Sequence, residues 1–417
     1  MSLITKTSTL TIRETLLAPL DKVAAACNDY RKCAELTDEM WLEVGVTRVF
    51  SDQKTGRGFL QQVGPQMVCC PAQSHYFETL KSERRLKVCQ AANADIANLL
   101  QGDPFAQYPG LAKFELYAAD GHWHGAAVHD EQIDERRWAV GHLYAQNLRT
   151  HALHHLALCE GKKENDIHTI KRLGAKRLRM KSPKGKKVLW VYDRACIDFT
   201  LWHYWKQQQG VYFITRTKQN MLREVIGETP YDEQAPINQG VEHDQLIQTS
   251  QHVVVRMITY TDAVSGQTYE FITTEMTLAP GLIAYLYLRR WDIEKTYDQF
   301  KNKYHEQKAW ANSATAKQMQ AEFICLAHNL LQLFNTQLEN EHGLTNQAEK
   351  ERRSKRLGQM KDQAEARGTH LPMLVEKGAS RLTQISLKLL RWLRAHWFSP
   401  LPLTALTPRL ALLYASL

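Results

Sequence analysis

Residues 287–301 read YLRRWDIEKTYDQFK, and the apolar and polar side chains of this stretch recur with the spacing of an α-helix. At about 100° per residue, four polar side chains fall within an arc of roughly 60° along one side of that helix. These four are Tyr287, Arg290, Glu294 and Lys301. An apolar stripe runs beside them, formed by Leu286, Ile293, Tyr297 and Phe300. We expect the stripe to pack against a sheet, which leaves the polar line at the edge of the buried face.

The polar line has two interpretations. A solvated helix face with salt bridges between residues four apart explains it without any chemistry. The composition favours a second interpretation, because one carboxylate is flanked by two cations and a phenol. That set suits a catalytic acid next to groups that clamp phosphates.

Two aspartates upstream follow apolar runs of strand length. Asp193 ends VLWVYD (188–193) and Asp120 ends FELYAAD (114–120). Each could be an ordinary turn or cap residue. Together with Glu294 they make three carboxylates, a set that can hold two Mg²⁺ ions for phosphoryl transfer.

The middle of the chain predicts an α/β fold. Three or four short apolar runs between residues 114 and 158 fit an antiparallel meander. A helix (164–174), a strand (188–195), a second helix (199–208) and a second strand (211–217) follow, and a long helical pattern resumes at Leu282. This order is compatible with an RNase H-like core, a mixed sheet with flanking helices, although an α/β domain of another topology fits the periodicity equally well.

The chain resembles a known family at these positions. Tyr287, Arg290, Glu294 and Lys301 reproduce the Y-(2)-R-(3)-E-(6)-K signature of the insertion-sequence-4 group of bacterial DDE transposases. YAADG (117–121) is similar to the first-aspartate region of that group, and the segment 191–220 is similar to its second-aspartate region. The resemblance covers roughly residues 110–335.

The resemblance implies a function and a set of site residues. Asp120, Asp193 and Glu294 would form the DDE triad on an RNase H-like fold and bind two Mg²⁺ ions, with Mn²⁺ as a plausible substitute. Tyr287, Arg290 and Lys301 would contact DNA. The expected reaction nicks the ends of an insertion element and joins the 3′-hydroxyls to target DNA. The expected partners are double-stranded DNA, both terminal inverted repeats and target, and a second copy of the chain in the DNA complex.

The residue pattern along the chain suggests a domain organisation. We expect a mainly helical DNA-binding region at 1–105 and the first part of the core at 106–217. A β-rich insertion at 218–280, the last core helices at 281–340 and a basic helical region for dimerisation or DNA contact at 341–417 would follow. Within 1–105, residues 41–62 look more strand-like. Group members that form a hairpin intermediate stack a flipped base on an insertion-domain Trp. Residues 206–290 contain no Trp, which leaves Tyr231, Tyr260 or Phe271 for that role.

Composition agrees with a DNA-binding protein. The chain has 417 residues and a net charge of +9. Eleven Lys and Arg against three acids lie between Glu160 and Trp190, a density that favours DNA backbone contact over a merely solvated face. The eight Cys are scattered and form no C-x-x-C, and no run of 18 apolar residues exists. We therefore expect a cytoplasmic protein without a membrane span. The resemblance implies that it is bacterial and nucleoid-associated.

Other interpretations remain open at this stage. His122 and His124 would point the same way on a strand and could bind Zn²⁺ or Fe²⁺. Asp130 rivals Asp120 as the first aspartate. An RNase H-like nuclease without strand transfer is the second enzyme hypothesis. A domesticated DNA-binding regulator is the hypothesis without catalysis.

Overall fold

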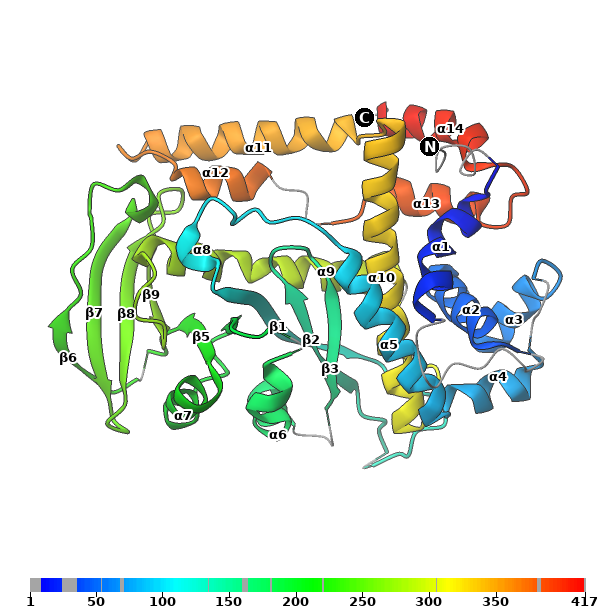
Figure 1. Cartoon of the computed structure of the whole chain (residues 1–417), viewed down its shortest axis with the longest axis horizontal. Coiled ribbons are helices and arrows are strands. Elements are labelled where there is room, and N and C mark those ends of the chain that lie inside the picture. The colour runs from blue at the N-terminus through cyan, green and yellow to red at the C-terminus, as the bar shows by residue number, and fades with distance from the viewer. Residues whose placement is uncertain are drawn as a thin grey trace.

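One mixed sheet organises the molecule (Figure 1). The computed structural model describes residues 9–24, 36–53, 55–67, 71–133, 135–159, 164–180, 182–219, 221–304, 306–380 and 384–415. Within these ranges nine strands pair in the order β3-β2-β1-β4-β5-β9-β8-β7-β6. The strands are β1 (Phe114–His124), β2 (Val140–Asn147), β3 (Leu153–Leu158), β4 (Lys187–Val191), β5 (Val211–Arg216), β6 (Arg223–Glu228), β7 (Val241–Thr249), β8 (Val254–Thr261) and β9 (Thr268–Thr273).

The first five strands form the core that the sequence predicts. β1, β2 and β3 are an antiparallel meander, and β4 and β5 run parallel to β1. The helices α6 (Asp166–Leu178) and α7 (Phe199–Gln209) make the two parallel crossovers. Asp198 caps the start of α7, and Gly210 ends it at a φ of 63°, which favours glycine. The α/β class and the RNase H-like arrangement are confirmed.

The predicted β-rich segment is also confirmed as β-rich, but it does not build a sheet of its own. β9 pairs with β5 in antiparallel fashion, and β8, β7 and β6 continue outward from it. The sequence between β5 and α8 (Pro280–Arg289) therefore extends the core sheet.

Helices cover both faces of the core sheet (Figure 1). α6 and α7 pack on one face against a cluster that includes Trp190 and Phe213. α9 (Trp291–Asn302) and the 29-residue α10 (Ala314–His342) belong to the larger cluster on the other face. Leu286, Ile293, Tyr297 and Phe300 are all buried in that larger cluster, as expected for the apolar stripe.

The N-terminal region is helical, with one local prediction wrong. Its described residues form α1 (Ile12–Ala24), α2 (Asp38–Phe50), α3 (Gly56–Val63), α4 (Gln73–Leu80) and α5 (Glu83–Leu99). Residues 41–62, which look strand-like, are mostly in α2 and α3. Thr37 and Thr55 cap these helices by accepting the N–H groups of Met40 and Gly58. Packing of α2 on α10 then outweighs the strand propensity of its Val and Phe residues.

The last helices of the described residues are α11 (Gln347–Glu365), α12 (Met373–Ser380), α13 (Leu387–His396) and α14 (Leu403–Ala415). α11 crosses the top of the molecule and buries few of its side chains (Figure 1). Arg367, just past its end, donates to the carbonyl of Val264 between β8 and β9 at 3.0 Å. The helices of the described residues include none with the length and apolar character of a membrane span.

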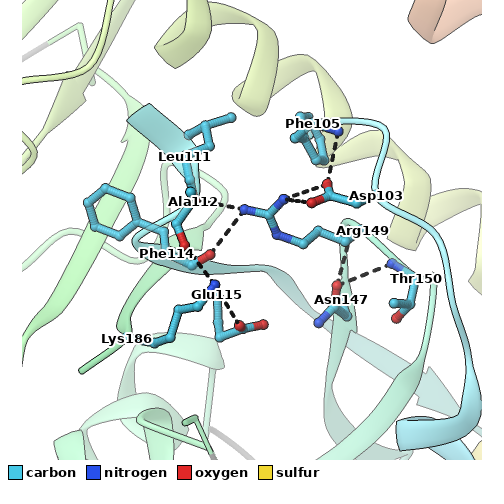
Figure 2. Close-up of polar contacts among 10 residues, drawn as sticks. All are labelled: Asp103, Phe105, Leu111, Ala112, Phe114, Glu115, Asn147, Arg149, Thr150 and Lys186. Carbon is cyan, nitrogen blue, oxygen red and sulfur yellow. Dashed lines mark hydrogen bonds and ion pairs between the residues drawn. The ribbon is translucent and has the colours of Figure 1, made fainter. Parts of the chain in front are cut away.

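Arg149, between β2 and β3, anchors the start of β1 (Figure 2). Its Nη2 donates to the carbonyls of Leu111 at 2.7 Å and Phe114 at 3.1 Å. Its Nη1 pairs with Asp103. These bonds tie the segment before β1 to the turn between β2 and β3, which fixes the strand that carries Asp120.

Candidate active site

Register brings the two predicted aspartates to the same level of the sheet. The parallel pairing of β1 with β4 ends where Ala118 faces Val191. Asp120 and Asp193 each lie two residues beyond that last pair, Asp120 within β1 and Asp193 just after the end of the neighbouring strand β4. The expectation that Asp120 ends its strand is wrong, because β1 continues to His124 while paired with β2. The pairing of β1 with β4 ends at Ala118, so no backbone pairing covers Asp120 on the β4 side.

The break between α8 and α9 carries the other predicted site residues. The sequence predicts one continuous helix, but the N–H of Arg290 bonds to the carbonyl of Tyr287 and the N–H of Ile293 to that of Arg290. Both bonds span three residues instead of four, so a tight turn of the 3₁₀ type separates α8 from α9. Glu294 therefore lies in the first turn of α9, not mid-helix.

Arg290 joins two of the carboxylates. Its Nη1 lies 2.7 Å from Oε1 of Glu294 and 3.7 Å from Oδ2 of Asp120. The side chain is only 5 % exposed, and its Nε has no hydrogen-bond partner among the described residues. The guanidinium also lies over the rings of Tyr287 and Trp291, at 5.6 and 5.3 Å from their centroids. It therefore neutralises this part of the site.

A fourth carboxylate, which the sequence analysis missed, reaches the same place. The N–H of Gly121 lies 2.9 Å from Oδ1 of Asp120 and 3.2 Å from Oδ2 of Asp166, so two carboxylates accept from one donor. Tyr297 of α9 donates to the carbonyl of Asp120 and holds the strand against the helix. The position of Asp166 after β3, at the start of a crossover helix, was the available signal.

The electrostatics agree with a crowded acidic site. Burial raises the pKa of Asp120 to about 7; the Arg290 guanidinium opposes this rise, and the charges of Asp166 and Glu294 add to it. Burial also raises the pKa of Asp166, against the hydrogen bond from Gly121, and the charge of Asp193 adds to it. Asp120, Asp166, Asp193 and Glu294 therefore share one electrostatic environment.

The other predicted DNA contacts differ in exposure. Tyr287 is buried beneath Arg290, whereas Lys301 is exposed near the end of α9. In the described ranges no hydrogen bond or ion pair connects Lys301 to the other five predicted site residues. Of the basic stretch, Lys162, Lys163 and Lys181 lie outside the described residues.

The donor set fits a hard divalent cation in type, since all four side chains offer carboxylate oxygens. Arg290 already acts as a stand-in cation between Asp120 and Glu294. As the side chains stand, no group of three or more His, Cys, Asp or Glu in the described part of the chain meets the geometry of a metal site. A cation at this site would therefore compete with the guanidinium for the same oxygens.

The histidine alternative is not supported. His122 and His124 do point the same way, but both face Glu306, with Nε2 atoms 2.9 and 3.6 Å from its oxygens. Hydrogen bonds link His124 to His142 and His142 to His155, and all three side chains are buried. Asp130, the rival first aspartate, pairs with Lys317 at 2.8 Å on the loop after β1 and joins none of these carboxylates.

An aromatic cavity of about 260 Å³ lies beside the site. Its lining includes Tyr260, Phe271, Tyr287, Trp291 and Arg216. Two of the three aromatic residues that the sequence offers for base stacking thus face one cavity. The third, Tyr231, instead donates to the carbonyl of Val241.

Comparison with known families agrees with the fold. Residues 145–330 match the family described as the transposase DDE domain. This segment, similar to a transposase DDE domain, holds Asp166, Asp193 and Glu294, and begins after Asp120. No curated protein matches the chain. The similarity to a transposase DDE domain, together with the RNase H-like core, therefore supports a transposase function in general terms.

Proposed function

We propose that the chain is a DNA transposase of the insertion-sequence-4 group, with Asp120, Asp193 and Glu294 as its catalytic triad. The observation that carries the proposal is the common level of Asp120 on β1 and Asp193 just after β4, with Arg290 bridging Glu294 and Asp120. This arrangement lies largely in the segment that matches the transposase DDE domain.

The triad would hold two Mg²⁺ ions, or Mn²⁺, through carboxylate oxygens. Such ions activate the attacking hydroxyl and stabilise the leaving oxygen of an in-line displacement. In the first step, water attacks the phosphorus at the element's end and the 3′-oxygen leaves as a hydroxyl. In the second step, that 3′-hydroxyl attacks a target phosphodiester, and the target's own 3′-oxygen leaves.

Arg290 has two roles in this proposal. In the chain without DNA it neutralises Asp120 and Glu294. A DNA phosphate offers the guanidinium a charged partner, because the planar guanidinium of arginine can bind two phosphate oxygens at once. Moving to the phosphate, Arg290 frees the carboxylates for cations. Tyr287 supports it from beneath, and Lys301 contacts the backbone farther along α9.

Other surfaces would hold the rest of the DNA. The exposed cations of α6 lie on the same crossover as Asp166 and suit backbone contact. The regions 1–105 and 341–417 would bind terminal repeats and a second copy of the chain, with 106–217 and 281–340 as core and 218–280 as insertion. The aromatic cavity offers rings for stacking a displaced base.

A nicking assay tests the proposal. The probe is a labelled duplex carrying the terminal repeat that flanks the gene, incubated with the full chain and Mg²⁺. Glu294→Gln should abolish nicking and leave duplex binding intact, because it removes a ligand charge without changing the basic surface. Asp298→Asn, one turn further along α9 and exposed, is the matched control and should nick normally.

The outcomes separate the alternatives. Nicking followed by joining to an unlabelled plasmid supports a transposase. Nicking without any joined product identifies a nuclease, and binding without nicking in the unaltered chain identifies a regulator. Retained nicking by Glu294→Gln would remove Glu294 from the catalytic residues.

A further inference from the structure

Asp166 is the first residue of α6, yet its carboxylate does not cap that helix. Asn165 does so, since its Oδ1 accepts the N–H of His168 at 3.2 Å. The Asp166 carboxylate reaches across to β1 instead, where it accepts the N–H of Gly121. The role of an ordinary helix-start acid is therefore filled by its neighbour.

The contact with β1 is unusually close. A Cβ at position 121 would lie 2.4 Å from Oδ1 of Asp166, well inside any real contact. Glycine at 121 thus allows the carboxylate to lie directly against the strand, beside Asp120. The carboxylates of Asp120 and Asp166 therefore both lie at the backbone N–H of Gly121.

Neutralisation of the site is uneven. Arg290 pairs with Asp120 and Glu294, but neither Asp166 nor Asp193 has a Lys or Arg within ion-pair distance among the residues that the structure describes. Tyr192, between them in sequence and 1 % exposed, has a hydroxyl without a hydrogen-bond partner in the same ranges. Like charges that are half-buried and have no counterion are costly, so this side of the site is where a cation stabilises most.

We propose that Asp166 is a fourth carboxylate of the cation site and binds a divalent cation together with Asp193. The inference rests on the proposed function, because it assigns another ligand to the same site. In this arrangement Arg290 neutralises Asp120 and Glu294, whereas Asp166 and Asp193 can bind a cation in the absence of DNA.

Direct Mn²⁺ binding to the full chain without DNA tests the inference, measured by calorimetry and by the paramagnetic resonance signal of free Mn²⁺. Asp166→Asn keeps an oxygen for the Gly121 N–H but removes the charge, and should weaken Mn²⁺ binding by about tenfold or more. Glu164→Gln is the matched control, since that carboxylate pairs with Arg172 at 2.9 Å and should leave Mn²⁺ binding unchanged.

Two further variants keep the result decisive. Asp166→Ser removes the carboxylate with a shorter side chain, so it introduces no new contact with Gly121. It should weaken Mn²⁺ binding as Asp166→Asn does. Asp120→Asn reports on the proposed function separately. If Asp120→Asn weakens Mn²⁺ binding while both Asp166 variants bind normally, Asp166 is structural and the inference fails alone. If all three bind Mn²⁺ as the unaltered chain does, the proposed cation site itself fails.

Discussion

Nη1 of Arg290 lies 2.7 Å from Oε1 of Glu294, so the proposed phosphate clamp and the proposed catalytic acid are bound to each other in the chain without DNA. Both lie at the tightened turn between α8 and α9, and the same guanidinium reaches Asp120. A side chain that is only 5 % exposed must exchange partners before it can contact a phosphate. The two roles of Arg290 are therefore sequential, and substitutions can separate them.

Replacing Arg290 by Lys should weaken DNA binding and nicking even though the charge is kept. Lysine cannot reproduce the planar fork that satisfies Glu294 and then a phosphate. We expect a loss of duplex affinity of about 1.5–3 kcal/mol, the range of a charged hydrogen bond. Titration of a labelled terminal-repeat duplex measures the change, and circular dichroism checks the fold. Unchanged affinity would restrict Arg290 to a structural ion pair.

Lys301→Ala should act on DNA in a simpler way, because Lys301 is exposed. Losing one phosphate contact should lower the slope of log K against log salt by roughly one unit, for any base sequence. Binding measured over a salt series, with a terminal-repeat duplex and an unrelated duplex in parallel, gives this slope. A change seen with only one duplex would contradict a backbone contact, and no change with either would make Lys301 a solvated surface charge.

Gly121→Ala should destabilise the chain, because the new methyl group overlaps the Asp166 carboxylate. We expect a loss of about 1–3 kcal/mol in the free energy of unfolding, the usual cost of overpacking. Gly227→Ala, where the added Cβ meets nothing within 4 Å, is the control. Urea unfolding measures both variants. The loss should shrink in an Asp166→Ser background, and equal losses in the two backgrounds would contradict the contact.

Local signals in the sequence predicted much of the fold. β4, α7 and β5 follow directly from an apolar run, an Asp cap and a Gly stop, all within about 30 residues. The strand-like pattern of α2 is misleading because the packing of α2 on α10 depends on residues nearly 300 positions away, and α3 packs on α4. The joining of β9 to β5 was likewise invisible, since a pattern of alternation does not say which edge a strand pairs with.

The candidate site divides in the same way. Asp120, Asp193, Tyr287, Arg290, Glu294 and Lys301 could be selected from the sequence by the signature and by the apolar runs before the aspartates. The Arg290 ion pairs could not, because they depend on the tightened turn at that residue. Asp166 was missed because its position at the start of the helix after β3 equally fits an ordinary helix-start acid. Only the approach of α6 to Gly121 makes it a neighbour of Asp120.

The fully buried His328 of α10 should make the stability of the chain fall in mild acid. Burial lowers the pKa of His328 to about 4, against the hydrogen bond to the carbonyl of His151, and Lys303 adds to the lowering. Between about pH 6.5 and 4 the unfolded chain binds a proton that the folded chain does not, so each unit of falling pH costs about 1.4 kcal/mol. Above that window the histidine is neutral in both states and contributes nothing to the pH dependence.

His328→Gln cannot titrate, so its unfolding free energy should fall less steeply over this window than that of the unaltered chain. Urea unfolding across the window measures the difference, with exposed His203→Gln as the control that should follow the unaltered chain. Parallel curves for His328→Gln and the unaltered chain would show that His328 titrates alike in the folded and unfolded states.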